Sequence, residues 1–261
     1  IAADIGWNSW YDLWDKVSAQ DVLDNATIAS SILTPHLPES VDHLRIVVDD
    51  GWQEAWGMWT PNEKFPNGLV GVAETLAANN MKAGVWLAPL LVGPGTTLAQ
   101  EHPEWLVQGA EFGHPVHGGL KVLDVTHPEA AAHLTNVIQT IVGWGYDLLK
   151  IDFLFAGTFP GGRHEDMTGM QAYKLAMEII REAAGEETIL LAVGAPGIPS
   201  LPYADSWRLG PDIAFEPTDA NWFFIPAQAR SIAARWHLCE ITLCDADPVL
   251  LRGLPQEEVE T

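Results

Sequence analysis

Short apolar runs alternate with amphipathic stretches along most of this chain. Residues 44–50 (LRIVVDD) form a run rich in β-branched side chains before Gly51, which is typical of a strand, whereas apolar residues recur on one face over residues 68–80, as in a helix. The same pattern predicts strands near residues 5–10, 44–50, 81–89, 146–153, 188–193, 206–209 and 241–244. It predicts helices near residues 19–33, 68–80, 126–144, 167–184 and 226–237.

Strands that are almost continuously apolar and alternate with helices indicate an α/β fold with a parallel sheet buried on both faces. We expect a (β/α)8 TIM barrel, with a doubly wound open sheet as the alternative. The first strand-to-helix turn lacks the GxGxxG and GxxxxGK[ST] patterns, which disfavours nucleotide binding. Only seven strands are predicted, and residues 254–261 look like the start of a seventh helix. We therefore expect residues 1–261 to be one incomplete barrel domain whose eighth strand lies beyond this sequence.

Three local features have simple interpretations. Residues 90–120 are rich in Gly, Pro and His and predict a long, mostly irregular excursion. Residues 126–129 (THPE) fit a capping box at a helix start, and Met170, Tyr173, Met177 and Ile180 fit an apolar stripe on the following helix. Cys239 and Cys244 lack CxxC spacing and are too few for a disulfide framework, so we expect two buried thiols.

Composition narrows the function classes. With 48% hydrophobic and 18% charged residues, the chain has enough apolar material to fold around a large core. Its net charge of −22 would repel nucleic acids and anionic membrane surfaces. No apolar run reaches the roughly 20 residues that span a bilayer. Because no basic signal segment is visible and cysteines are few, we expect a cytoplasmic location. The nine histidines are scattered without ligand spacing, so neither a metal nor another cofactor is implied.

Polar side chains collect where the predicted strands end. In parallel barrels the loops after these ends form the catalytic pocket. Some of these residues could simply cap turns or helices, and a Lys–Asp pair could be a structural ion bridge. Their joint occurrence at four strand ends favours a pocket instead. The residues are Asp49 and Asp50, Lys150 and Asp152, Arg208 and Asp212, and Asp245 and Asp247.

The number and the positions of the tryptophans support a sugar-binding pocket. The chain has 12 tryptophans, and although core packing is the default for any one of them, aromatic walls beside carboxylates suit a neutral polyhydroxylated ligand. Those near the predicted strand ends are Trp7, Trp10, Trp52, Trp56, Trp59, Trp86 and Trp105.

Two carboxylates that face one pocket match the needs of glycosidic bond cleavage, in which one attacks or stabilises the anomeric carbon and the other protonates the leaving oxygen. Strand alternation places Lys150 and Asp152 on the same side, so the lysine should lower the pKa of Asp152 and keep this carboxylate ionised. Asp212 is the candidate for the second carboxyl group, which must hold its proton longer.

The motifs that contain these residues resemble those of retaining α-galactosidases of the melibiase type, glycoside hydrolase family 36, in the clan that also holds families 27 and 31. The resemblance runs in order along nearly the whole chain. The motifs are residues 6–11 (GWNSWY), 48–53 (VDDGWQ), 64–68 (KFPNG), 84–89 (GVWLAP), 102–105 (HPEW), 123–128 (LDVTHP), 149–153 (LKIDF), 208–212 (RLGPD) and 245–248 (DADP).

The resemblance implies a role for each matching residue. Asp152 would be the nucleophile that forms a covalent glycosyl-enzyme, and Asp212 the general acid/base of a double displacement. The remaining residues would bind the galactosyl unit: Asp49 and Asp50 would hold hydroxyls at its non-reducing end, Trp10 and Trp86 would wall the sugar, and Lys150 and Arg208 would donate to ring hydroxyls and carboxylates.

The chain also departs from the family pattern. Relatives commonly have a Gly-Cys-Gly stretch on strand five where this chain has Val193, and many have a tryptophan soon after the aspartate corresponding to Asp212, where residues 213–217 read IAFEP. The β domains that usually flank the barrel are absent from this sequence. The leading hypothesis is an exo-acting α-galactosidase on raffinose- or melibiose-type substrates, with an α-N-acetylgalactosaminidase, a raffinose-synthase-like galactosyltransferase or a non-catalytic sugar-binding fragment as alternatives. We expect the 261-residue chain by itself to be inactive or unstable without the remaining strand.

Overall fold

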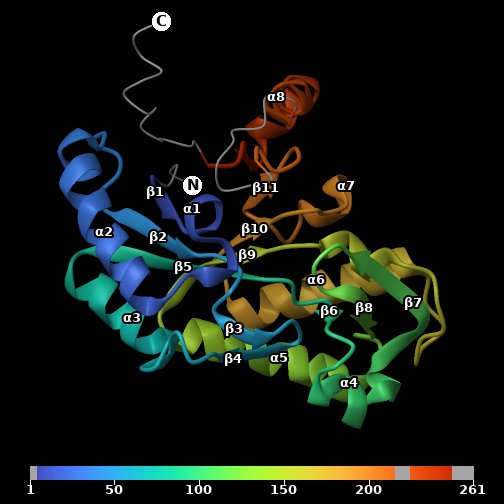
Figure 1. Cartoon of the computed structure of the whole chain (residues 1–261). Coiled ribbons are helices and arrows are strands. Elements are labelled where there is room, and N and C mark those ends of the chain that lie inside the picture. The colour runs from blue at the N-terminus through green and yellow to red at the C-terminus, as the bar shows by residue number, and fades with distance from the viewer. Residues whose placement is uncertain (1–4, 215–223, 249–261) are drawn as a thin grey trace, which may run out of the picture.

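A seven-stranded, wholly parallel sheet forms the centre of the computed structural model, which describes residues 5–214 and 224–248 (Figure 1). Every neighbouring pair in the sheet is parallel. In spatial order its strands are β1 (Gly6–Asn8), β2 (Leu44–Val48), β5 (Met81–Leu87), β9 (Tyr146–Ile151), β10 (Ile189–Ala192), β11 (Ser206–Arg208) and β12 (Leu243–Asp245). Spatial order follows chain order, as in a curled (β/α) barrel, so the open doubly wound alternative is wrong.

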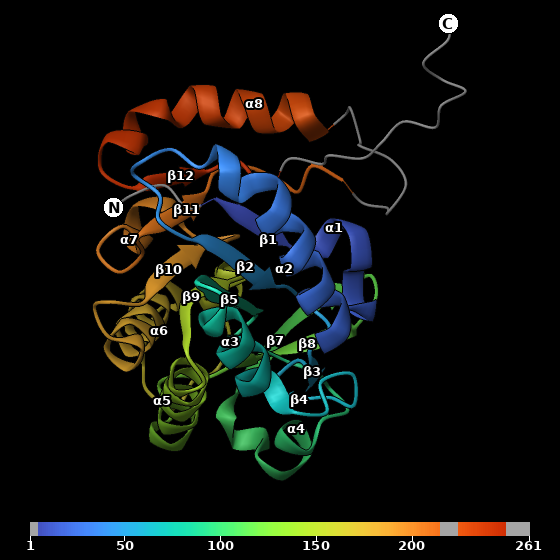
Figure 2. The same cartoon turned by 90° about the vertical axis from the view of Figure 1, so that its left-hand side faces the viewer.

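Helices follow the strands and cover the outside of the sheet (Figure 2). The four long ones pack in sequence around it: α2 (Ala19–Leu33), α3 (Gly68–Ala78), α5 (Pro128–Gly143) and α6 (Gly169–Ala184). Shorter helices are α1 (Trp10–Leu13), α4 (Thr97–Glu101), α7 (Gly197–Ser200) and α8 (Phe224–Arg235). None of the helices in the two described ranges is both long and apolar enough to cross a membrane. The expected final helix at residues 254–261 lies outside the described residues.

The strands form where the apolar runs were identified because both faces of the sheet are buried. Ile46, Val85, Leu149 and Ile151 in adjacent strands are completely inaccessible to solvent. Each such side chain contributes about 1.5–3 kcal/mol through removal of apolar surface from water. The core is therefore continuous from β2 to β9, and the polar residues that follow these strands start from fixed positions.

The sequence predicted where the helices lie better than it predicted the residues that begin them. Thr168 and Gln171 form a capping box at the start of α6, and its inner face is buried. Met170 is 40% exposed, so its assignment to the apolar stripe is wrong. The predicted capping box at residues 126–129 is also wrong: His127 is the N-cap of α5, and the Thr126 hydroxyl instead donates to Asp124 at 2.6 Å.

Residues 90–120 are not mostly irregular. They contain β6 (Leu91–Val92), β7 (Leu106–His114) and the first half of β8 (Gly118–Leu123), which form an antiparallel sheet in the order β6–β8–β7. Earlier in the chain, β3 (Gln53–Ala55) pairs with β4 (Met58–Pro61) in a hairpin. The prediction failed because β7 is half exposed and contains glycine, so no continuous apolar run marks it.

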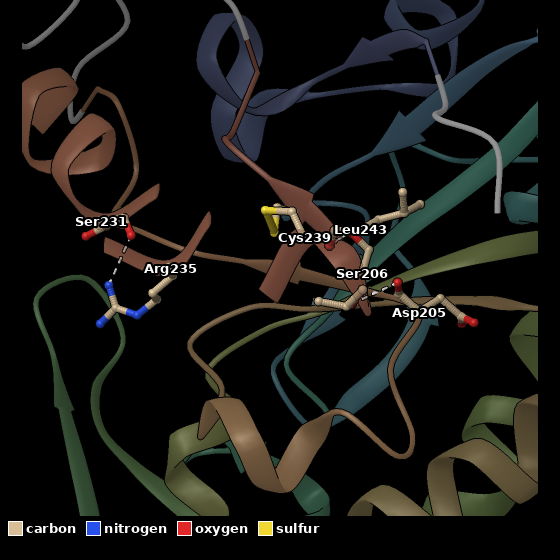
Figure 3. The surroundings of a disulfide bond; sticks show 8 residues. Asp205, Ser206, Ser231, Arg235, Cys239 and Leu243 are labelled. Atoms are coloured by element: carbon tan, nitrogen blue, oxygen red, sulfur yellow. Dashed lines mark hydrogen bonds between the residues drawn. A yellow bond between two sulfur atoms is a disulfide. The ribbon is translucent and has the colours of Figure 1, made fainter. Parts of the chain in front are cut away.

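The expectation of two buried thiols is also wrong, because Cys239 and Cys244 form a disulfide (Figure 3). A short 3₁₀ segment, Trp236–Glu240, turns the chain back toward β12 and brings the two Cα atoms within 5.3 Å. Cys239 is exposed and Cys244 is partly buried. The sequence spacing could not show this turn. The bond ties the start of β12 to the segment before it.

Replacing Cys239 with Ser should lower the free energy of unfolding by about 2 kcal/mol, the loop-closure value for a six-residue ring. Urea unfolding with and without a reducing agent measures this difference. The reducing agent should destabilise the wild-type protein but leave the Cys239→Ser protein unchanged. Equal stability of the oxidised wild type and the variant would contradict a stabilising role for the bond.

Candidate active site

The carboxyl ends of the parallel strands bring the predicted polar residues together. The register pairs Trp86 of β5 with Lys150 of β9, and Arg208 of β11 with Asp245 of β12. Asp49 and Asp50 directly follow β2. Because all the strands run in the same direction, these side chains share one rim of the sheet.

Lys150 of β9 pairs with Asp49, which follows β2, across the intervening strand β5. Its Nζ donates to Asp49 Oδ2 at 2.6 Å, and the two side chains are 6% and 2% exposed. Asn8 Nδ2 donates to the same oxygen at 2.7 Å, and the Ser9 hydroxyl accepts from the Asp49 amide. Burial is the largest single effect and favours the neutral amine, but the carboxylates of Asp49, Asp152 and Asp247 together outweigh it and raise the pKa of Lys150, so the ammonium stays charged.

Asp152 lies just past β9, partly buried, and both of its oxygens are held. Phe153 N–H donates to Oδ1 at 2.6 Å and Trp86 Nε1 donates to Oδ2 at 3.1 Å. The first contact requires a sharp turn, since Phe153 takes the left-handed conformation with φ of 52°. The turn fixes the orientation of the carboxylate.

The predicted net lowering of the Asp152 pKa is wrong. Burial raises the pKa of Asp152 above its ordinary value, and repulsion from Asp212 adds to the rise, while Lys150 only partly opposes it. The physical reason is that burial of the carboxylate disfavours its ionised form by more than the attraction of Lys150 favours it. The charges of Asp152 and Asp212 are close enough to repel each other.

Asp50 is a buried acid held by two donors. Gln53 Nε2 and Trp56 Nε1 both donate to its Oδ1, at 2.5 and 3.2 Å. Burial raises the pKa of Asp50 to about 6, and the nearby Asp49 carboxylate adds to the effect. Asp50 therefore changes charge within the pH range in which many proteins work.

Arg208 is the second cation of the site and binds three carboxylates. Its Nε lies 2.6 Å from Asp245 Oδ2, its Nη1 3.0 Å from Asp212 Oδ1 and its Nη2 2.7 Å from Asp247 Oδ1. These three anions raise its pKa against the opposing effect of burial. Asp245 and Asp247 thus serve this ion cluster, while the Asp212 side chain remains 45% exposed.

Four of the tryptophans belong to the buried hydrophobic core: Trp52, Trp56, Trp59 and Trp86. The ring centroids of Trp56 and Trp86 lie 5.2 Å apart, and their indole nitrogens donate to the site carboxylates Asp50 and Asp152. Trp10 packs on Trp14 just after β1, whereas Trp105 stacks on His102 beside α4.

Several residues that shape the site were not identified from the sequence. Asn8, Gln53 and Phe153 orient the carboxylates through the contacts above, and Tyr11 bonds to Asp247. Asn8 and Tyr11 sit in the quoted GWNSWY motif, immediately after β1, and this position was a usable signal. Val193 is buried at the end of β10, and the unusual segment after Ala214 lies outside the described residues.

Metal ligands were not expected from the sequence. In the described part of the chain, no group of three or more His, Cys, Asp and Glu side chains is arranged to hold a metal ion.

Asp50→Asn should change how stability depends on pH. Because the folded-state pKa of Asp50 is raised to about 6, its stabilising contribution is complete below the unfolded pKa near 4 and is lost as the pH rises through 6. The asparagine protein should therefore gain about 1–3 kcal/mol over wild type at pH 8, with a smaller difference at pH 4.5. Urea unfolding at both pH values measures this, with the exposed Asp166→Asn as control. A larger gain at pH 4.5 would contradict the assignment.

Several known proteins are similar to this chain. The family model for Melibiase matches residues 36–176. An α-galactosidase of Escherichia coli is 28% identical over 150 residues, which cover 53% of this chain and 21% of that protein. Alpha-galactosidase C of Emericella nidulans is 28% identical over 115 residues, 37% of this chain and 15% of that protein.

Solved structures extend the comparison over the whole fold. An α-galactosidase of Thermus thermophilus superposes with a TM-score of 0.80 at 31% identity, covering 99% of this chain and 55% of that one. A family 36 α-galactosidase of Geobacillus stearothermophilus, at 18% identity and a TM-score of 0.62, covers 78% of this chain and 30% of its own and shares the fold. The chain thus spans about half of the Thermus enzyme and about a fifth of the Escherichia coli protein. With the family model matched over more than half of its length, this chain belongs to the Melibiase family.

Proposed function

We propose that this chain is the catalytic barrel of a retaining exo-α-galactosidase that hydrolyses terminal α-galactosides of the raffinose or melibiose type. The observation that carries the proposal is the pair of Asp152 and Asp212, two carboxylates that follow different strands, β9 and β11, and whose charges interact. The Thermus relative, solved in complex with p-nitrophenyl α-galactopyranoside and with stachyose, supports this substrate class.

Asp152 is the proposed nucleophile. Its carboxylate attacks the anomeric carbon as the bond to the leaving oxygen breaks, which forms a covalent galactosyl-enzyme. The Phe153 amide and the Trp86 indole hold its two oxygens and so restrict the direction of attack. Attack requires the ionised form of Asp152. Two positive charges favour this form: that of the nearby Lys150 and the one that develops on the sugar.

Asp212 is the proposed general acid/base. Its carboxyl group gives a proton to the leaving oxygen in the first step and takes one from water in the second, when the hydroxide oxygen replaces Asp152 at the anomeric carbon. Arg208 binds Asp212 Oδ1, and the side chain remains 45% exposed, which supports access of the other oxygen to a substrate.

The sugar would be recognised by the buried polar residues beside Asp152. Asp49 and Asp50 would accept from hydroxyls at the non-reducing end, while Lys150 has further N–H donors beyond the one given to Asp49. Trp86, and Trp10 on the side of β1, would wall the ring. Because Arg208 already contacts three carboxylates, we propose that it acts mainly on the acids rather than on ring hydroxyls.

The cytoplasmic location stays a prediction. The disulfide between Cys239 and Cys244 is more typical of an oxidising compartment and weighs against it. We retain a small-molecule carbohydrate as the proposed partner.

Hydrolysis of a panel of p-nitrophenyl α-glycosides by the full-length protein tests the proposal, and the 261-residue chain alone is assayed beside it because we expect it to be inactive or unstable. The galactoside should react fastest, and product analysis by NMR should show retained configuration at the anomeric carbon. Asp152→Gly should lose at least about 10³-fold in kcat and Asp212→Gly about 10²–10⁴-fold.

Azide distinguishes the two roles. It should rescue Asp152→Gly with a β-galactosyl azide of inverted configuration, and Asp212→Gly with the retained α-azide. The exposed Asp166→Gly serves as a matched control and should keep wild-type rates. Full activity of Asp152→Gly would refute the mechanism, whereas preference for a glucoside or an N-acetylgalactosaminide would refute only the substrate.

A further inference from the structure

A side-chain contact bridges the two outer strands of the parallel sheet. β1 and β12 stand at opposite ends of the strand order, and no backbone pairing between them occurs in the described residues. Tyr11 follows β1 and Asp247 follows β12, and the Tyr11 hydroxyl donates to Asp247 Oδ2 across 236 residues of sequence. The bridge therefore lies at the carboxyl rim, beside the proposed catalytic acids.

The same carboxylate makes two further contacts. Asp247 Oδ1 lies 2.7 Å from Arg208 Nη2, and Oδ2 accepts from the backbone amide of Ile213 at 3.0 Å. The Ile213 amide also points at the Tyr11 hydroxyl, 3.1 Å away. Tyr11 and Asp247 thus bind the backbone of the residue that directly follows Asp212.

Asp212 is consequently held at two points. Its side chain bonds to Arg208, whose own position depends on Asp245 and Asp247, and its backbone is fixed through Ile213. The Asp247 side chain is 1% exposed, so water cannot readily replace these bonds. Neither Tyr11 nor Asp247 needs to touch the substrate to affect where Asp212 lies.

The charges suit a permanent clamp. Burial raises the pKa of Tyr11 far above its ordinary value, and the Asp212 and Asp247 carboxylates add to the rise, so the phenol keeps its proton and remains a donor. Burial raises the pKa of Asp247 to about 6, opposed by Arg208 and Lys150. With either protonation state of Asp247, an oxygen remains available to accept from Tyr11 or Ile213.

We propose that Tyr11 and Asp247 are positioning residues that hold Asp212 in place for proton transfer to the leaving oxygen. This proposal rests on the function proposed above. In the first step the bond from the anomeric carbon to the leaving oxygen breaks, Asp152 bonds to that carbon, and the Asp212 proton moves to the leaving oxygen. A displaced Asp212 impairs only the proton transfer. The loss should therefore be largest when the leaving group is a poor one that needs the proton.

Leaving-group dependence tests this proposal. In Tyr11→Phe and Asp247→Asn, kcat/KM for melibiose should fall by about 10- to 100-fold, because small misplacements of a catalytic group have effects of this size. For 2,4-dinitrophenyl α-galactoside, whose leaving group needs little protonation, kcat/KM should fall less than about threefold. Tyr203→Phe is the matched control and should leave both values unchanged. Tyr203 lies just before the amino end of β11, whereas Tyr11 and Asp247 lie at the carboxyl rim of the sheet.

The outcomes separate the two proposals. Equal losses on both substrates, or no loss on either, would overturn the positioning role while wild-type activity stands. Absence of α-galactoside hydrolysis in the full-length wild-type protein would instead overturn the proposed function. Circular dichroism checks that each variant is folded, and Tyr11→Phe, which removes one hydroxyl and keeps the ring, decides the matter if Asp247→Asn does not fold.

Discussion

The pairing of buried carboxylates with two cations, Lys150 and Arg208, is the constraint on which the site depends. Ionised groups next to a core of inaccessible aliphatic side chains are costly unless they are paired and hydrogen-bonded. Lys150 meets this need for Asp49, and Arg208 for Asp212, Asp245 and Asp247. The parallel strand register places both cations at the same rim and so decides where each carboxylate lies.

The two cations do not balance the acids around them. Asp50 and Asp247 both have pKa values raised to about 6, and the pKa of Asp152 is raised as well. An excess of carboxylates suits a reaction in which positive charge develops on the substrate, because the developing charge relieves repulsion that exists in the free protein. This links the electrostatics of the site to the proposed cleavage of a glycosidic bond, in which ionised Asp152 is stabilised as the sugar becomes positive.

Much of the fold could be predicted from sequence because the central strands β2, β5 and β9 are buried on both faces. The apolar runs marked all seven parallel strands, and the positions after them marked the polar rim. Strand alternation predicted Lys150 and Asp152 on one side, but it could not show that the lysine would bond to Asp49, since this depends on the register between β2, β5 and β9. The antiparallel sheet at β6–β8 and the turn that joins Cys239 to Cys244 depend on half-exposed strands and local backbone geometry, which leave weak sequence signals.

The central claim is that Asp152 forms a covalent bond with a galactosyl group, and trapping that species tests it most directly. The probe is a fluorinated galactosyl fluoride, which forms the galactosyl-enzyme readily but slows its hydrolysis. It should label the purified protein once, and peptide mass spectrometry should place the label on Asp152. Label on a different residue, or turnover of an α-galactoside with inverted product and no label, would contradict the account.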